Sequence, residues 1–286
     1  MSEPDALLLP PGPLDAAWVE REYNNRERVP EHPALFARWE RDSAFVRETL
    51  PGSLDIAYGP HARHRFDFFP AAGGERLLVF FHGGYWRGLD KRFFSWLAPS
   101  YAAAGVSVAV ANYRLCPEVR IPDIVDDATA ALNAIAAHAS GAQRIVLAGH
   151  SAGGQIVGAL FTQGADRFAF DPARIAGGVP VSGVFDFRAI PLFSSNAELK
   201  LDADSAKALD LYDQTTVVKA PLVVAVGGAE SGEFLRQSRL LADRWKPQVK
   251  SLLELPTLDH FTVMDAMVER GQPLYKATLG LFERGP

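Results

Sequence analysis

The fold is decided by residues 144–160, which read RIVLAGHSAGGQIVGAL. The apolar run near the start is typical of a strand buried on both faces, and the apolar and small residues at the end are typical of a helix. Gly149 and Gly153 flank Ser151 at two residues on either side, so the chain can turn sharply without side-chain clashes. The stretch therefore predicts a strand, a tight turn and a helix, with the Ser151 hydroxyl exposed at the edge of a sheet.

The rest of the chain alternates between short apolar runs and longer segments with helical patterning. This alternation predicts an α/β fold with a mostly parallel sheet of about eight strands, covered by helices on both faces. The first two strands are short, and we expect them to be antiparallel. The expected strands are 54–58, 65–69, 77–81, 106–111, 145–148, 177–181, 222–226 and 251–255, and the clearest helices are 91–104, 122–139 and 273–283.

Composition excludes several classes of function. The chain has 286 residues, 48% of them hydrophobic, and a net charge of −5 without basic runs, so we expect neither a nucleic-acid nor a membrane partner. The single cysteine, Cys116, excludes an internal disulfide framework and favours a cytoplasmic protein. Histidines and cysteines show no metal-ligand spacing, so we expect no metal and no cofactor. The sequence leaves the oligomeric state open, a homodimer included.

A serine hydroxyl at neutral pH needs a base to take up its proton and an acid to orient that base. When a serine at a strand–helix turn acts in this way, the serine, the acid and the histidine follow one another along the chain. His260 is the only histidine after Ser151. It comes a few residues after the expected strand 251–255, at the same sheet edge as the serine. His260 is therefore the candidate base.

Three carboxylates compete for the role of the acid. Glu230 follows the expected strand 222–226 and a glycine turn, at the correct edge of the sheet. Glu233 comes one turn later, where it can stabilise the N-terminus of a helix. Asp259 adjoins His260, and neighbouring side chains in an extended chain diverge. We favour Glu230, with Glu233 as the alternative.

The negatively charged oxygen of a tetrahedral intermediate needs preorganised N–H donors. Gly83 and Gly84 follow the expected strand 77–81, and two adjacent glycines let the backbone come close to the developing charge. With the N–H of Ala152 they form the predicted oxyanion hole of three donors. His82 is expected to support this loop rather than to act as a second base.

Aromatic residues near these segments predict the substrate pocket. An aromatic lining suits a flat aryl substrate, although such residues also fit plain core packing. The substrate-binding candidates are Tyr85, Trp86, Phe185 and Phe193.

We expect one domain that comprises residues 1–286. The first fifty residues carry aromatic and charged side chains at helical spacing, but too few apolar ones for a core of their own. Residues 1–50 are therefore predicted to be a helical flank or lid, and residues 51–286 to be the catalytic core.

Several segments carry a family resemblance. They read YNNR at 23–26, HGGYW at 82–86, VSGVFD at 181–186, SN at 195–196, ESGEFLRQS at 230–238 and DHF at 259–261. Together they resemble the kynurenine formamidase (arylformamidase) branch of the α/β-hydrolase fold, within the esterases and lipases that carry a histidine-glycine-glycine oxyanion loop. The resemblance implies hydrolysis of an N-formyl group from an aryl amine, and of activated aryl or short-chain esters. In that family an aspartate usually stands where this chain has Glu230.

The sequence predicts the type of reaction more firmly than it predicts the substrate. The segment 202–216 departs from the family pattern. A general carboxylesterase for short acyl chains would share the site and differ only in its pocket. A non-catalytic binding protein on the same fold is a third interpretation, disfavoured because the serine, acid, histidine and both glycines are all present.

Overall fold

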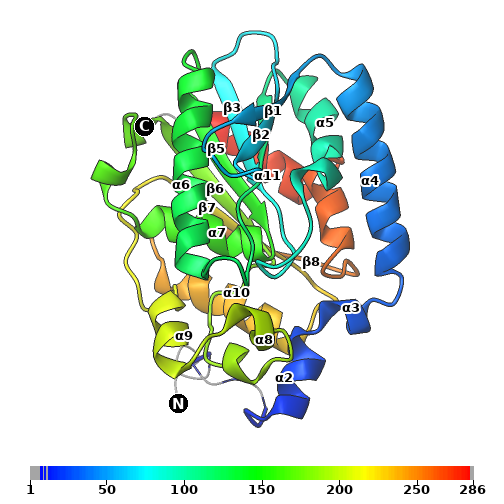
Figure 1. The fold of residues 1–286 in the computed structure, drawn as a ribbon, viewed down its shortest axis with the longest axis vertical. Coiled ribbons are helices and arrows are strands. Elements are labelled where there is room, and N and C mark those ends of the chain that lie inside the picture. Colours follow the sequence, from blue (N-terminus) through cyan, green and yellow to red (C-terminus); the bar gives the residue numbers. More distant parts are fainter. Residues whose placement is uncertain (1–6, 9, 11, 284–286) are drawn as a thin grey trace.

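A computed structural model of the chain describes residues 7, 8, 10 and 12–283, and these residues form a sheet of eight strands (Figure 1). The strand order is β1-β2-β4-β3-β5-β6-β7-β8. The β1/β2 and β2/β4 pairs are antiparallel and the other pairs are parallel, which confirms the expected fold class. The strands are β1 (Ser53–Ala57), β2 (Arg65–Phe69), β3 (Arg76–Phe81), β4 (Ser107–Ala111), β5 (Arg144–His150), β6 (Ile175–Val181), β7 (Leu222–Gly227) and β8 (Val249–Leu255).

Helices cover both faces of the sheet (Figure 1). The helices α2, α6, α7 and α10 contribute to the core on one face, and α4, α5 and α11 to the core on the other. Within the described residues, none of the helices is long and apolar enough to cross a membrane. Their bounds are α2 (Ala16–Tyr23), α3 (Asn25–Arg28), α4 (His32–Thr49), α5 (Ala98–Ala102), α6 (Ile121–His138), α7 (Ala152–Thr162), α8 (Asn196–Leu199), α9 (Ala203–Leu209), α10 (Gly232–Arg244) and α11 (Pro273–Glu283).

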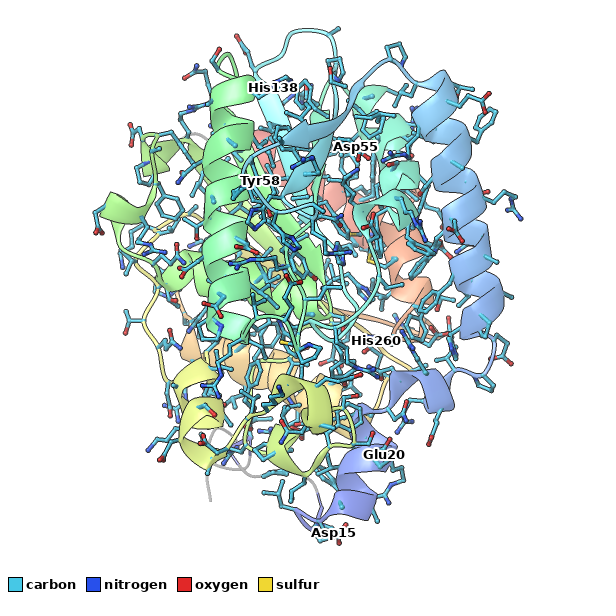
Figure 2. The ribbon with its side chains drawn as sticks, viewed as in Figure 1. Asp15, Glu20, Asp55, Tyr58, His138 and His260 are labelled. Carbon is cyan, nitrogen blue, oxygen red and sulfur yellow. The ribbon has the colours of Figure 1, made fainter. Side chains whose placement is uncertain are left out.

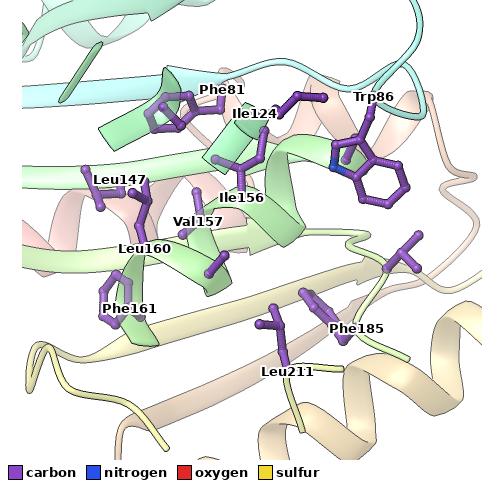
Figure 3. Packing of buried hydrophobic residues seen from close by; sticks show 14 of the residues in the cluster. Phe81, Trp86, Ile124, Leu147, Ile156, Val157, Leu160, Phe161, Phe185 and Leu211 are labelled. Carbon is purple, nitrogen blue, oxygen red and sulfur yellow. The ribbon is translucent and has the colours of Figure 1, made fainter. Parts of the chain in front are cut away.

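The central strand β5 shows why its apolar run is continuous. Ile145 and Leu147 point into the core on the α7 side, and Val146 and Ala148 point into the core on the α11 side. Figure 3 shows Leu147 packed with residues of α7 such as Leu160. Because both faces of β5 are buried, all of these residues are apolar and the strand has no alternation of polar and apolar residues.

The expected helix 91–104 is only partly correct. The chain forms two 3₁₀ turns, Lys91–Phe93 and Ser95–Leu97, before the short helix α5 begins. Pro99 lies in the first turn of α5. Proline lacks the N–H group that a helix interior requires, so the α-helix starts here rather than running through.

The N-terminal flank packs against the core through buried polar contacts. The Tyr23 hydroxyl donates to Glu233 Oε1 of α10 at 2.9 Å, and the Tyr85 hydroxyl donates to the Tyr23 carbonyl at 2.5 Å. The long helix α4 packs against the other face of the sheet, together with α5 and α11 (Figure 1). Residues 1–6, 9 and 11 of the predicted flank lie outside the described residues, and its role as a lid stays a prediction.

Candidate active site

Ser151 occupies a strained turn between β5 and α7. Its backbone angles are φ 55° and ψ −117°, a conformation that residues with a side chain rarely adopt. A Cβ atom on Gly149 would collide with the backbone oxygen of Gly153, and one on Gly153 would collide with that of Phe81. The turn closes only because both positions are glycine, and it leaves the serine side chain at the carboxyl end of β5.

The structure brings Glu230 and His260 together beside this turn. The Nδ1–H of His260 donates to Glu230 Oε2 at 2.6 Å, and both side chains are buried. Glu230 Oε1 accepts from the Gly227 N–H at 2.8 Å and from the Ser182 hydroxyl at 2.5 Å. In Figure 2, His260 lies below the strands, toward the end of the molecule at which Figure 1 labels α2 and α3. The carboxylate is thus fixed in position, and it orients the imidazole ring.

The other two acid candidates have different partners. Glu233 is bound by Arg236, whose Nε donates to Oε2 at 2.7 Å, and by the Tyr23 hydroxyl. Asp259 Oδ1 accepts from the backbone N–H groups of the two residues after His260, at 2.8 and 2.9 Å. Of the three carboxylates, the structure places only Glu230 against the histidine.

The loop 82–86 passes directly over the serine. A Cβ atom on Gly83 would lie 2.9 Å from the His150 carbonyl oxygen and 3.1 Å from Ser151 Cβ. Gly84 has φ 116°, and a Cβ there would collide with the Gly88 carbonyl oxygen. Ala152 is the first residue of α7, directly after the serine. Gly83 and Ala152 thus lie next to Ser151, and Gly84 lines the same cavity as the serine.

His82 supports this loop from behind. Its Nδ1 donates to the Gly83 carbonyl at 2.6 Å, and its ring stacks on Tyr113 at 4.4 Å between centroids. Burial lowers the pKa of His82 to about 4, so the ring is neutral near pH 7. A neutral histidine bound to its own loop fits the expected supporting role.

Sequence reasoning missed His150, the residue before the serine. Its Nε2–H donates to the His260 carbonyl at 2.7 Å, and the two rings lie 4.8 Å apart between centroids. Burial and the neighbouring His260 lower the pKa of His150 well below its ordinary value, so it holds the base in place without carrying a charge. Its place inside the glycine–serine–glycine turn was the signal that could have found it.

A cavity of about 80 Å³ opens at Ser151 and His260. Of the four predicted substrate-binding residues, Tyr85 and Phe193 line it. Its other aromatic lining residues are Phe36, Trp39 and Phe261.

Trp86 and Phe185 require a correction, because neither belongs to the cavity wall. Trp86 is fully buried, and its Nε1–H donates to Gln155 Oε1 at 3.1 Å. Phe185 is 1% exposed and packs in the core on the α7 side (Figure 3). Tyr85 and Trp86 both have positive φ angles, 51° and 55°, and their rings meet edge to face, 6.1 Å apart between centroids.

Comparisons with known proteins show what the chain is similar to. Residues 78–231 match the family model described as alpha/beta hydrolase fold. A kynurenine formamidase from Danio rerio is 26% identical over 247 residues, which cover 82% of each protein. A carboxylesterase from Mycobacterium tuberculosis, NlhH, is 33% identical over 178 residues, which cover 54% of this chain and 51% of that one. A solved structure from Silicibacter sp. TM1040, described as a candidate thioesterase, superimposes with a TM-score of 0.84 at 33% identity and covers 93% of this chain and 98% of that one. This chain therefore belongs to the α/β-hydrolase fold family, and it is an esterase-type hydrolase.

Proposed function

We propose that the enzyme is a serine hydrolase that cleaves a small acyl group from an aryl amide or ester, and that its principal activity is that of an arylformamidase. The observation that carries the proposal is the bond between Glu230 and His260 at the cavity that Ser151 also lines. The likeness to proteins named kynurenine formamidase supports the formyl group as the acyl group.

In the proposed reaction, Ser151 Oγ attacks the carbonyl carbon while His260 Nε2 takes up the serine proton. The carbonyl π-electrons move onto the oxygen, and the N–H groups of Gly83, Gly84 and Ala152 stabilise the resulting oxyanion. The buried Glu230 carboxylate stabilises the imidazolium that forms. His260 then gives the proton to the leaving nitrogen or oxygen as its bond to carbon breaks, which leaves an acyl-serine.

A water molecule completes the cycle. The water oxygen attacks the acyl-serine while His260 takes up a proton from the water, and a second oxyanion forms in the same hole. When this intermediate collapses, the carbon–Oγ bond breaks and His260 returns the proton to Ser151. The products are formate, or another small acid, and the aryl amine or alcohol. No step requires a metal.

The size of the cavity supports a small acyl group and a flat leaving group. The whole cavity has a volume of only about 80 Å³, which favours a formyl or acetyl group over a long chain. Phe36, Tyr85 and Phe193 offer aromatic faces on which an aryl ring can stack. A general carboxylesterase for short acyl chains is the second candidate, supported by the likeness to NlhH.

A substrate panel separates the two candidates. We would compare N-formylkynurenine with 4-nitrophenyl acetate, butyrate and octanoate by kcat/KM. An arylformamidase turns over the formyl amide efficiently and prefers acetate to octanoate by at least about tenfold, which corresponds to about 1.4 kcal/mol of steric exclusion. Turnover of the esters without turnover of the formyl amide would favour the carboxylesterase. Efficient turnover of octanoate would contradict a tight acyl side in either case.

A further inference from the structure

The N–H groups of the expected oxyanion hole come from two separate elements. Gly83 and Gly84 lie on the loop after β3, whereas Ala152 is the first residue of α7. Donors stabilise a developing charge well only when each is held within about half an ångström of its place. The loop and the helix therefore have to be fixed relative to each other.

The start of the loop is fixed by close contact between backbones. A Cβ atom on Gly153 of α7 would collide with the Phe81 carbonyl oxygen and would lie 2.7 Å from that of His82. A Cβ atom on Gly83 would lie 3.1 Å from Ser151 Cβ. This packing holds the first residues of the loop against the start of α7.

The next part of the loop is strained. Gly84, Tyr85 and Trp86 have φ angles of 116°, 51° and 55°, a run of three residues in a region that side chains disfavour. Strain of this kind persists only where surrounding contacts hold the chain. The Tyr85 hydroxyl donates to the Tyr23 carbonyl of α2. The Trp86 carbonyl accepts from the Cys116 N–H at 2.8 Å, so neither bond reaches α7.

A side-chain hydrogen bond ties this strained part of the loop to α7. The Trp86 Nε1–H donates to Gln155 Oε1 at 3.1 Å, and both side chains are buried. An indole nitrogen can only donate, so the oxygen of the amide has to face it. The Gln155 N–H in turn donates to the Ser151 carbonyl at 3.1 Å. Figure 3 shows Trp86 in the same buried cluster as Ile156, the next residue of α7.

We propose that Trp86 and Gln155 are positioning residues that hold the Gly84 N–H in register with the Ala152 N–H. The proposal deepens the proposed function and rests on it for the place of the oxyanion. Trp86 does not line the cavity, so it acts through the loop and not on the substrate. The oxyanion forms only on the way to the tetrahedral intermediate. Loss of the bond should therefore weaken its stabilisation while substrate binding is kept.

Two variants each remove one side of the bond. Trp86→Phe removes the donor, and Gln155→Met removes the acceptor with little change in side-chain length or helix propensity. With phenyl acetate, each should lose about ten- to a hundredfold in kcat and keep KM within about threefold. The double variant should lose no more than the weaker single variant, because both changes act on one bond. Losses that multiply would overturn the pairing.

A ketone inhibitor reports on the oxyanion directly. Ser151 Oγ adds to the ketone carbon of 2,2,2-trifluoroacetophenone, the serine proton passes to His260, and the ketone oxygen becomes an oxyanion in the hole. Its Ki should rise in both variants by the factor by which kcat/KM falls. The Ki of phenol, which has no carbonyl group, should stay unchanged. An unchanged Ki for the ketone would overturn the positioning role.

Trp245→Phe is the matched control. Trp245 is buried in the same core cluster, and its Nε1–H donates to the Leu211 and Gln214 carbonyls at 3.1 and 2.9 Å, away from the cavity. This variant also loses a buried indole and its hydrogen bonds, so it should lower Tm as Trp86→Phe does. It should nevertheless keep kcat and the Ki of the ketone. An equal loss of kcat in Trp245→Phe would mean that a loosened core is the cause, and it would overturn the proposal.

The remaining outcomes separate this proposal from the proposed function. If Trp86→Phe does not fold, Gln155→Met decides the question, because it leaves the indole ring in place. Full kcat in folded Gln155→Met would overturn the positioning role. Failure of the unmodified enzyme to hydrolyse phenyl acetate or to bind the ketone would instead refute the proposed function, whatever the variants show.

Discussion

Replacement of Glu230 with glutamine is the sharpest perturbation of the proposed site. Glu230 Oε1 accepts two hydrogen bonds, from the Gly227 N–H and the Ser182 hydroxyl, whereas Oε2 accepts one from His260. The amide oxygen of the variant should occupy the place of Oε1, because two donors face it, and the amide nitrogen should then face His260. An N–H group opposite Nδ1 favours the imidazole tautomer with its proton on Nε2. That tautomer cannot accept the serine proton.

We expect kcat/KM of Glu230→Gln to fall about 10⁴-fold, or about 5.4 kcal/mol of transition-state stabilisation. The assay is the initial rate with phenyl acetate, with circular dichroism to show that the fold is kept. Glu233→Gln is the control: Glu233 binds Tyr23, Arg236 and Gln237, so this variant should lose less than about tenfold in rate while its Tm falls. A Glu230→Gln variant that keeps a tenth of the activity, or a Glu233→Gln variant that loses more activity than Glu230→Gln, would refute the assignment of Glu230 as the acid.

Three further predictions follow from the structure. The buried His82, with a pKa of about 4 against an ordinary 6.5, binds protons more weakly in the folded protein than in the unfolded chain, so the free energy of unfolding should fall as the pH is lowered through this range. His82 contributes about 3 kcal/mol at most to this fall in the free energy of unfolding. Urea titrations at pH 7 and pH 4.5 measure the fall, which should be smaller in His82→Asn. Trp86→Ala should lower stability by about 3–5 kcal/mol, because Trp86 is a core residue, and unaltered stability with a widened acyl-chain range would contradict that position. Incubation with EDTA should leave kcat unchanged, whereas inactivation that zinc reverses would contradict the proposed mechanism.

The parts that were predictable from the sequence depend on local pattern and chain order. The buried strand β5 and the turn at Ser151 are encoded within a few consecutive residues, because only glycine fits at the two flanking positions. His260 could be found because the chain offers no other histidine after the serine. Glu230 could be found because parallel strands bring their carboxyl ends to one edge of the sheet.

The parts that were not predictable depend on packing between distant segments. Asn25 and Arg26 reach the cavity because Tyr23 anchors the N-terminal flank to α10, more than two hundred residues later in the chain. Trp86 follows the oxyanion glycines directly, yet two consecutive positive φ angles direct its ring into the core. Residues 91–104 form 3₁₀ turns and a short helix because Pro99 interrupts the α-helix. The sequence prediction relied on the helical pattern of these residues and did not take Pro99 into account.

Active-site labelling followed by mass spectrometry tests whether Ser151 is the nucleophile. A serine-directed aryl phosphonate should modify Ser151 alone, at a rate that matches the loss of activity. Ser151→Ala should not be labelled, and it should lose about 10⁴- to 10⁶-fold in kcat while keeping its Tm. Undiminished hydrolysis by Ser151→Ala, or inactivation with the label on another residue, would contradict the assignment of Ser151 as the nucleophile.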